Sequence, residues 1–136
     1  MIEDFAAVAF GGALGAVVRA LLIRWTASLA SLGSIRGIRF EPTFATILPN
    51  ALGCMILGFY LFSPAFPSLP GGDEARGSLT LLLTTGICGG LTTFSTLCAD
   101  GVRLGEGPGL RSALLYLAIT LGTGFLAFNL FAPAGL

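Results

Sequence analysis

The chain has 136 residues, of which 54% are hydrophobic and only 10% are charged, and its mean hydropathy is +0.90. A soluble domain usually carries about a quarter charged residues, so this composition excludes an ordinary water-soluble protein and indicates one embedded in a lipid bilayer. All 7 basic residues are arginine, histidine is absent and the formal net charge is zero. These features argue against a nucleic-acid-binding surface and remove the commonest metal ligand and general base.

Four segments are predicted to cross the membrane as helices, at about residues 5–30, 43–62, 78–103 and 111–132. Each is close to the 20 mainly apolar residues that a membrane-spanning helix needs. The start, Met1-Ile2-Glu3-Asp4, is acidic where a secretory signal would be basic, so the first segment is expected to stay in the protein. Short connections rich in glycine and proline leave no room for a soluble domain. The predicted fold class is an all-α membrane protein with a single four-helix transmembrane domain over residues 1–136.

Small residues are spread through these segments, and Gly11 and Gly15 are four positions apart. In lipid, small residues at this spacing let two helix backbones approach closely, so we expect tight helix packing there. Cys54, Cys88 and Cys98 each lie in an apolar run without the spacing of metal ligands, and we expect them to act as small packing residues.

The most informative segment is Gly86–Thr96, in the middle of the third predicted helix. Its glycine and hydroxyl residues are poor helix formers, so a break in the helix is expected. Unwound backbone inside a membrane is tolerated only where protein or a cavity covers it, and its free carbonyl and amide groups can bind ions. A kinked helix whose glycines serve packing alone is the alternative.

The string Gly89–Thr96, which reads GGLTTFST, resembles the signature of the Fluc (CrcB) family of fluoride channels. Three further matches occur in order along the chain: Gly12-Ala13-Leu14-Gly15-Ala16 followed by Arg19, Asn50 followed by Gly53 and Gly58, and Tyr116 followed by Thr120. The resemblance therefore covers all four predicted helices.

The resemblance implies a fluoride-selective passive anion channel that exports fluoride across the cell inner membrane. It further implies an antiparallel dimer in which the backbone carbonyls of Gly89 and Thr92 bind a structural sodium ion. The pore residues that it implies are amide and hydroxyl donors and one aromatic ring, whose edge is weakly positive: Asn50, Phe94, Ser95, Thr96, Tyr116 and Thr120.

Several of these assignments have a structural alternative. Asn50 follows Pro49 and can satisfy backbone groups that the proline leaves free, and Thr120 can bond back to its own helix. Tyr116 can anchor a helix at the membrane interface. Arg19 is expected to be a structural charge near the end of the first helix rather than a pore residue.

The chain departs from the family pattern at three positions. Leu97 stands where a second phenylalanine is common, Gly124 where a second hydroxyl is common, and Asp100 where a glutamate is frequent. The first of these removes one aromatic edge from the expected pore.

The arginines are distributed unevenly between the two sides of the membrane. Arg76 is in the second connection, whereas five arginines flank the first and third connections: Arg24, Arg36, Arg39, Arg103 and Arg111. Because arginine-rich connections stay in the cytoplasm, this bias predicts one fixed orientation with both termini outside. The second subunit is then expected to be an oppositely oriented homologue, although an identical copy is the alternative.

Two other membrane functions were considered. A small proton-coupled multidrug transporter needs a carboxylate inside the membrane, and Asp100 at the end of the third helix is the one candidate. A non-transporting subunit would dimerise tightly without any ion flux. An enzyme is not expected, since no catalytic set of residues is visible.

Overall fold

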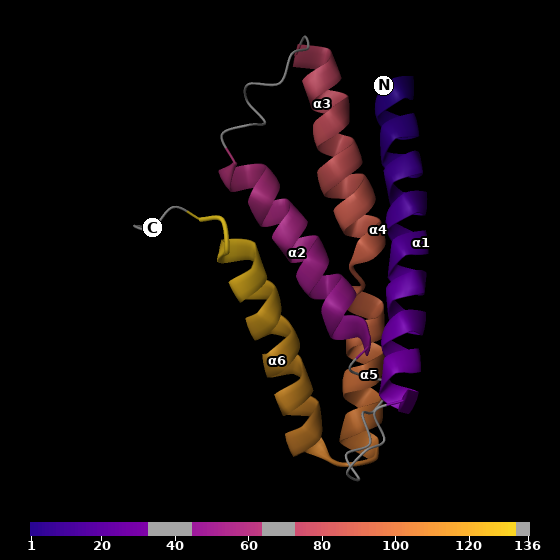
Figure 1. Cartoon of the computed structure of the whole chain (residues 1–136), viewed down its shortest axis with the longest axis vertical. Helices are drawn as coiled ribbons and strands as arrows, with labels where there is room; N and C mark the ends of the chain where they lie inside the picture. Colours follow the sequence, from indigo (N-terminus) through magenta and orange to yellow (C-terminus); the bar gives the residue numbers. More distant parts are fainter. Residues whose placement is uncertain (33–44, 64–72, 133–136) are drawn as a thin grey trace.

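The computed structural model describes the backbone of residues 1–32, 45–63 and 73–132, which is helical apart from short connecting turns (Figure 1). Its elements are α1 (Ile2–Leu32), α2 (Ile47–Phe62), α3 (Asp73–Leu81), the π-helix η2 (Leu82–Cys88), α4 (Gly89–Leu91), α5 (Phe94–Glu106) and α6 (Leu110–Asn129). The all-α fold class is therefore confirmed for this part of the chain.

Within the described residues, three segments are long and apolar enough to cross a membrane: Ile2–Ser28, Gly77–Glu106 and Leu110–Asn129. The apolar helix α2 is shorter, with 16 residues, which corresponds to about 24 Å at 1.5 Å per residue. Residues 43–44, where the second span was predicted to begin, lie outside the described residues. The first helix continues to Leu32, so Arg19 lies inside it rather than near its end.

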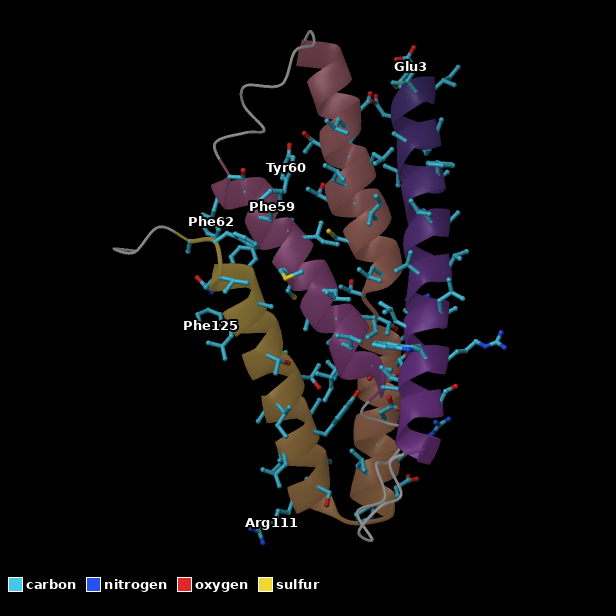
Figure 2. The ribbon with its side chains drawn as sticks, viewed as in Figure 1. Glu3, Phe59, Tyr60, Phe62, Arg111 and Phe125 are labelled. Atoms are coloured by element: carbon cyan, nitrogen blue, oxygen red, sulfur yellow. The ribbon has the colours of Figure 1, made fainter. Side chains whose placement is uncertain are left out.

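The helix α1 and the succession from α3 to α5 run in one direction, and α2 and α6 run in the other (Figure 1). The end of α1, the end of α5 and the start of α6 lie toward one end of the molecule, and the N-terminus lies at the other, while α2 begins beside the start of α5. Glu3 and Arg111 mark these two ends in Figure 2. The helix α1 packs along η2 and α4, whereas α6 packs against α2 and α5.

Glycines bring α1 and the third span into backbone contact. A Cβ atom placed on Gly11 would lie 2.6 Å from the carbonyl oxygen of Leu82, and one placed on Gly86 would lie 2.9 Å from the Cα atom of Gly11. One on Gly90 would overlap the backbone of Gly12. The close packing predicted from the spacing of Gly11 and Gly15 is confirmed, and its partners are glycines of η2 and α4.

Larger side chains fill the other helix contacts. Where α2 meets the end of α6, the rings of Phe59 and Phe131 pack edge to face with centroids 5.0 Å apart, as do those of Phe62 and Phe128 at 5.5 Å. Nearer the other end of α6, a buried cluster joins α5 to α6 and consists of Leu97, Leu104, Ala113 and Tyr116. These contacts hold α2, α5 and α6 around the segment between α4 and α5.

The segment between α4 and α5 consists of Thr92 and Thr93. Thr92 has a ψ of 159° and Thr93 has a φ of −149°, so both have extended backbone. β-branched residues are less favourable in helices, and threonine is also a favoured N-cap because its hydroxyl accepts a backbone amide. Thr93 is the N-cap of α5, where its hydroxyl oxygen accepts the amide of Thr96.

Candidate functional site

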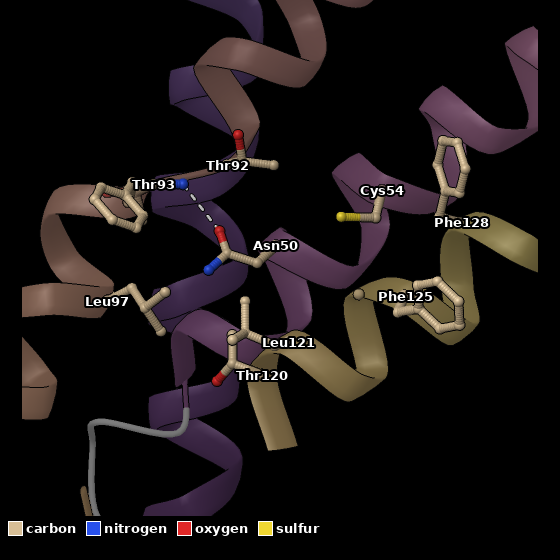
Figure 3. A pocket seen from close by; sticks show the side chains of 11 residues that line it. Asn50, Cys54, Thr92, Thr93, Leu97, Thr120, Leu121, Phe125 and Phe128 are labelled. Atoms are coloured by element: carbon tan, nitrogen blue, oxygen red, sulfur yellow. Dashed lines mark hydrogen bonds between the residues drawn. The ribbon is translucent and has the colours of Figure 1, made fainter. Parts of the chain in front are cut away.

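An open groove of about 420 Å³ lies beside this extended segment, between α2, α5 and α6 (Figure 3). None of the residues that line it is charged: Asn50, Cys54, Thr92, Thr93, Phe94, Leu97, Thr120, Leu121, Gly124, Phe125 and Phe128. Four predicted site residues, Asn50, Thr92, Phe94 and Thr120, are therefore brought together from three parts of the chain. The groove combines a few polar groups with a mainly apolar surface.

Asn50 places a side-chain carboxamide in the wall of the groove. Its Oδ1 atom accepts a hydrogen bond of 2.9 Å from the backbone amide of Thr93 (Figure 3). The Nδ2 atom points away from that bond, into the groove. The predicted amide donor at Asn50 therefore faces the groove, and the same side chain also satisfies the backbone of Thr93.

Breaking the helix changes the partners of two carbonyl groups. In an uninterrupted helix the amide of Thr93 would donate to Gly89 and that of Thr96 to Thr92. Instead, the Thr93 amide donates to Asn50, and the Thr96 amide donates to the Thr93 hydroxyl at 3.3 Å. The carbonyls of Gly89 and Thr92, which were predicted to bind sodium, thus both lose their helical amide donors.

Arg19 reaches one of these carbonyls. Its Nη1 atom donates to the Thr92 carbonyl oxygen at 3.0 Å. A carbonyl oxygen has two lone pairs, so the Thr92 oxygen keeps one acceptor position. Two carbonyl oxygens are hard ligands that fit an alkali cation, but they are too few to surround one, and the described residues contain no cluster of three His, Cys, Asp or Glu that would hold a metal.

The hydroxyl groups that begin α5 bond mainly to one another. Thr93 Oγ1 donates to Thr96 Oγ1 at 2.9 Å and lies 3.3 Å from Ser95 Oγ. Ser95 and Thr96 do not line the groove, whereas Phe94 lines it with 78% of its surface exposed. Of these three predicted pore residues, the structure brings only Phe94 to the groove.

The two predicted donors of α6 have different surroundings. Thr120 lines the groove, but its hydroxyl donates to the Tyr116 carbonyl at 2.8 Å. Tyr116 is fully buried and does not line the groove. Its hydroxyl lies 2.7 Å from Thr46 Oγ1 and donates to Asp100 Oδ2 at 3.4 Å, which joins the starts of α2 and α6 to α5.

Sequence reasoning missed Thr93 and Cys54. Cys54 is four positions after Asn50 and therefore on the same face of α2, which is a signal that could have found it. Its sulfur lies 3.3 Å from the place of a Cβ atom on Gly124, so the absent side chain at Gly124 leaves space for the thiol. For Thr93 the missing information is tertiary, because its amide partner lies on another helix.

The chain was compared with known families and proteins. Residues 6–132 match the model of the family described as CrcB-like protein, Camphor Resistance (CrcB). Two archaeal relatives are named fluoride-specific ion channel FluC: one from Ignicoccus hospitalis, 34% identical over 90% of this chain and 87% of the relative, and one from Methanopyrus kandleri, 37% identical over 92% and 83%. A bacterial relative of the same name, from Thermus thermophilus, is 37% identical over 92% of this chain and 87% of its own. The resemblance seen in the sequence is thus confirmed, and the chain belongs to the CrcB-like protein family.

Proposed function

We propose that this protein is a fluoride-selective passive channel of the plasma membrane. The relatives described above are named fluoride-specific ion channels, and each aligns with this chain over most of its length. Within the molecule, the observation that carries the proposal is the uncharged groove with the Nδ2 group of Asn50 pointing into it. A fixed charge would bind a small anion too tightly for rapid release, whereas an amide donor in an apolar groove binds it weakly.

Phe94 is the second element of the proposed pore. Its ring is largely exposed at the groove, so its weakly positive edge is available to a dehydrated anion. Thr120 contributes its hydroxyl oxygen to the same wall, and Ser95 and Thr96 lie on the adjoining turn of α5. Tyr116 would reach the ion only if its hydroxyl left Thr46 and Asp100.

Passive conduction needs no proton coupling. Hydrogen fluoride crosses membranes and ionises in the cytoplasm, so a leak for the anion lowers cytoplasmic fluoride. Asp100, the carboxylate that a proton-coupled transporter would need, is 5% exposed and is not among the groove residues. The protein is a multi-pass membrane protein of a channel family and not an enzyme.

The proposal includes four spans, the third broken at Thr92–Thr93, and an antiparallel second subunit. Each subunit would offer the carbonyls of Gly89 and Thr92 to one sodium ion between the two breaks. The need for a second subunit is consistent with the two oxygens that one chain supplies. Sodium bound there would fix the relative position of the two subunits.

The arginine bias supports a fixed orientation with the first and third connections in the cytoplasm. Among residues whose side chains are described, Arg24, Arg103 and Arg111 lie toward that end, whereas Arg36, Arg39 and Arg76 fall outside them. We therefore propose an oppositely oriented homologue as the partner subunit. A tag-accessibility assay on intact cells is expected to find one orientation, and equal populations of both would refute this part of the proposal.

The channel function is tested by fluoride efflux from liposomes that contain the purified protein, measured with a fluoride electrode. We expect rapid loss of fluoride and no loss of chloride, and a large decrease in fluoride efflux for Phe94→Ile. If a well-folded sample is silent, the efflux is measured again after co-expression with an oppositely oriented homologue. Silence in that experiment as well would disprove the channel.

A further inference from the structure

The hydrogen bond between the Thr93 amide and Asn50 has a consequence for anion selection. We propose that Thr93 is a positioning residue: its backbone N–H fixes the carboxamide of Asn50 so that the NH2 group, rather than the oxygen, faces the groove. The bond is 2.9 Å long and crosses from the extended segment to α2 (Figure 3). This inference rests on the proposed fluoride function, because it concerns how the groove presents a donor to an anion.

The orientation follows from the chemistry of the two groups. A carboxamide has an acceptor oxygen on one side and a donor nitrogen on the other, and the two sides are nearly equal in size. A backbone N–H can only donate, so it selects the oxygen of Asn50. The nitrogen is then directed into the groove. A carboxamide turned the other way would present an acceptor, which repels anions and attracts cations.

Three contacts of the surrounding segment hold the Thr93 amide in place. The Thr93 hydroxyl caps α5 by accepting the Thr96 amide, and the preceding carbonyl, that of Thr92, accepts from Arg19 at 3.0 Å. Gly53 allows α2 to come close, since a Cβ atom there would overlap the methyl group of Thr92. The donor that orients Asn50 is therefore part of a fixed framework, which preorganises the groove before an ion arrives.

The same bond links the orientation of Asn50 to the helix break. If Thr92 and Thr93 were helical, the Thr93 amide would return to the Gly89 carbonyl. Asn50 would then lose its fixed partner, and the Gly89 oxygen would lose its availability to a cation. One exchanged hydrogen bond thus produces both the anion donor on one side of the break and the free carbonyl on the other.

The direct test replaces the Thr93 amide by an ester, by incorporating the α-hydroxy acid analogue of threonine. The side chain and its cap remain and the N–H that binds Asn50 is lost, while the Thr92 carbonyl becomes an ester carbonyl that accepts hydrogen bonds more weakly. Arg19→Met, which removes the donor to that carbonyl and leaves the Thr93 amide in place, is the control for this second change. We expect fluoride efflux to fall by about tenfold or more, since one hydrogen bond of about 1.4 kcal/mol corresponds to that factor. The matched control is the same ester at Thr123, which lies on α6 outside the groove, and its efflux should stay within about threefold of the unmodified protein.

A second pair of variants separates orientation from structure. Asn50→Asp keeps an acceptor for the Thr93 amide but has no donor for the groove, whereas Asn50→Ala removes both. Fluoride efflux should be lost in each. Hydrogen exchange should find the Thr93 amide protected in the unmodified protein and in Asn50→Asp, and unprotected in Asn50→Ala. Asn129→Asp is the control, because Asn129 donates to Phe125 at the end of α6 and does not line the groove.

These outcomes distinguish the two proposals. If the unmodified protein conducts and the Thr93 ester conducts equally well, the positioning role is wrong although the channel stands. If no fluoride passes in any form, with or without a partner subunit, the fluoride function is wrong. Fast exchange of the Thr93 amide in the unmodified protein would overturn the positioning role in either case.

Discussion

The two sides of the third span differ in how they pack. Toward α1, the backbones of η2 and α4 approach through Gly11, Gly86 and Gly90 with no space for a methyl group. Toward α2 and α6, the extended segment that follows α4 borders an open groove (Figure 3). One side is a fixed support, because its contacts are between backbones, and the other leaves space for an ion. The comparison teaches that the site depends on residues that never touch the groove.

The largest expected effect comes from filling the glycine contact. In Gly90→Val the new side chain would overlap the backbone of Gly12, which cannot move aside without displacing α1. Overpacking costs about 1–3 kcal/mol and more where backbone must move, so we expect aggregation in detergent and no fluoride efflux. Gly122→Val is the control, because a Cβ atom at Gly122 meets nothing within 4 Å. A monodisperse, conducting Gly90→Val protein would show that the support is not rigid.

The open side is tested by access of a thiol reagent. Cys54 lines the groove, and Cys98 is exposed on the neighbouring helix α5 outside it. A small methanethiosulfonate reagent on Cys54 should reduce fluoride efflux by about tenfold, because the adduct fills the space in front of Gly124. Cys54→Ser should abolish the block, and Cys98→Ser should leave it unchanged. If mass spectrometry finds Cys54 modified while fluoride efflux is unaffected, the groove is not the path of the ion.

Much of the fixed side was predictable from the sequence. The spans follow from the length of the uncharged stretches, and the contact with α1 follows from the spacing of Gly11 and Gly15, since both are local patterns. The π-helical stretch Leu82–Cys88, which precedes α4 and the break, was not anticipated. A π-helix has no simple compositional signal and often marks a functional segment.

The open side was harder to predict because its partners are distant in the sequence. Asn50 and Thr93 are 43 positions apart, so no local pattern indicates that one amide orients the other. The family resemblance implied that Tyr116 is a pore donor, whereas its burial against Thr46 and Asp100 depends on how α2, α5 and α6 meet. Residue types and spacing identify which segments are polar, whereas tertiary contacts decide which polar atoms are available.

The smallest expected effect concerns Arg19, which connects the two sides. It extends from α1 to the Thr92 carbonyl, which has lost its helical amide donor. Arg19→Met keeps an apolar side chain of similar length but leaves that carbonyl without this charged donor. A hydrogen bond to a charged group contributes about 2 kcal/mol, so the thermal unfolding midpoint in detergent should fall by several degrees.

Arg24→Met on the same helix is the control for charge and helix propensity, because the Arg24 side chain is exposed. It should change stability by less than about 0.5 kcal/mol. If Arg19→Met is as stable as Arg24→Met but conducts less fluoride, then Arg19 acts on the ion rather than on the structure. If stability and efflux fall together, the support provided by α1 extends through Arg19 to the edge of the groove, and the structural role predicted for this residue holds.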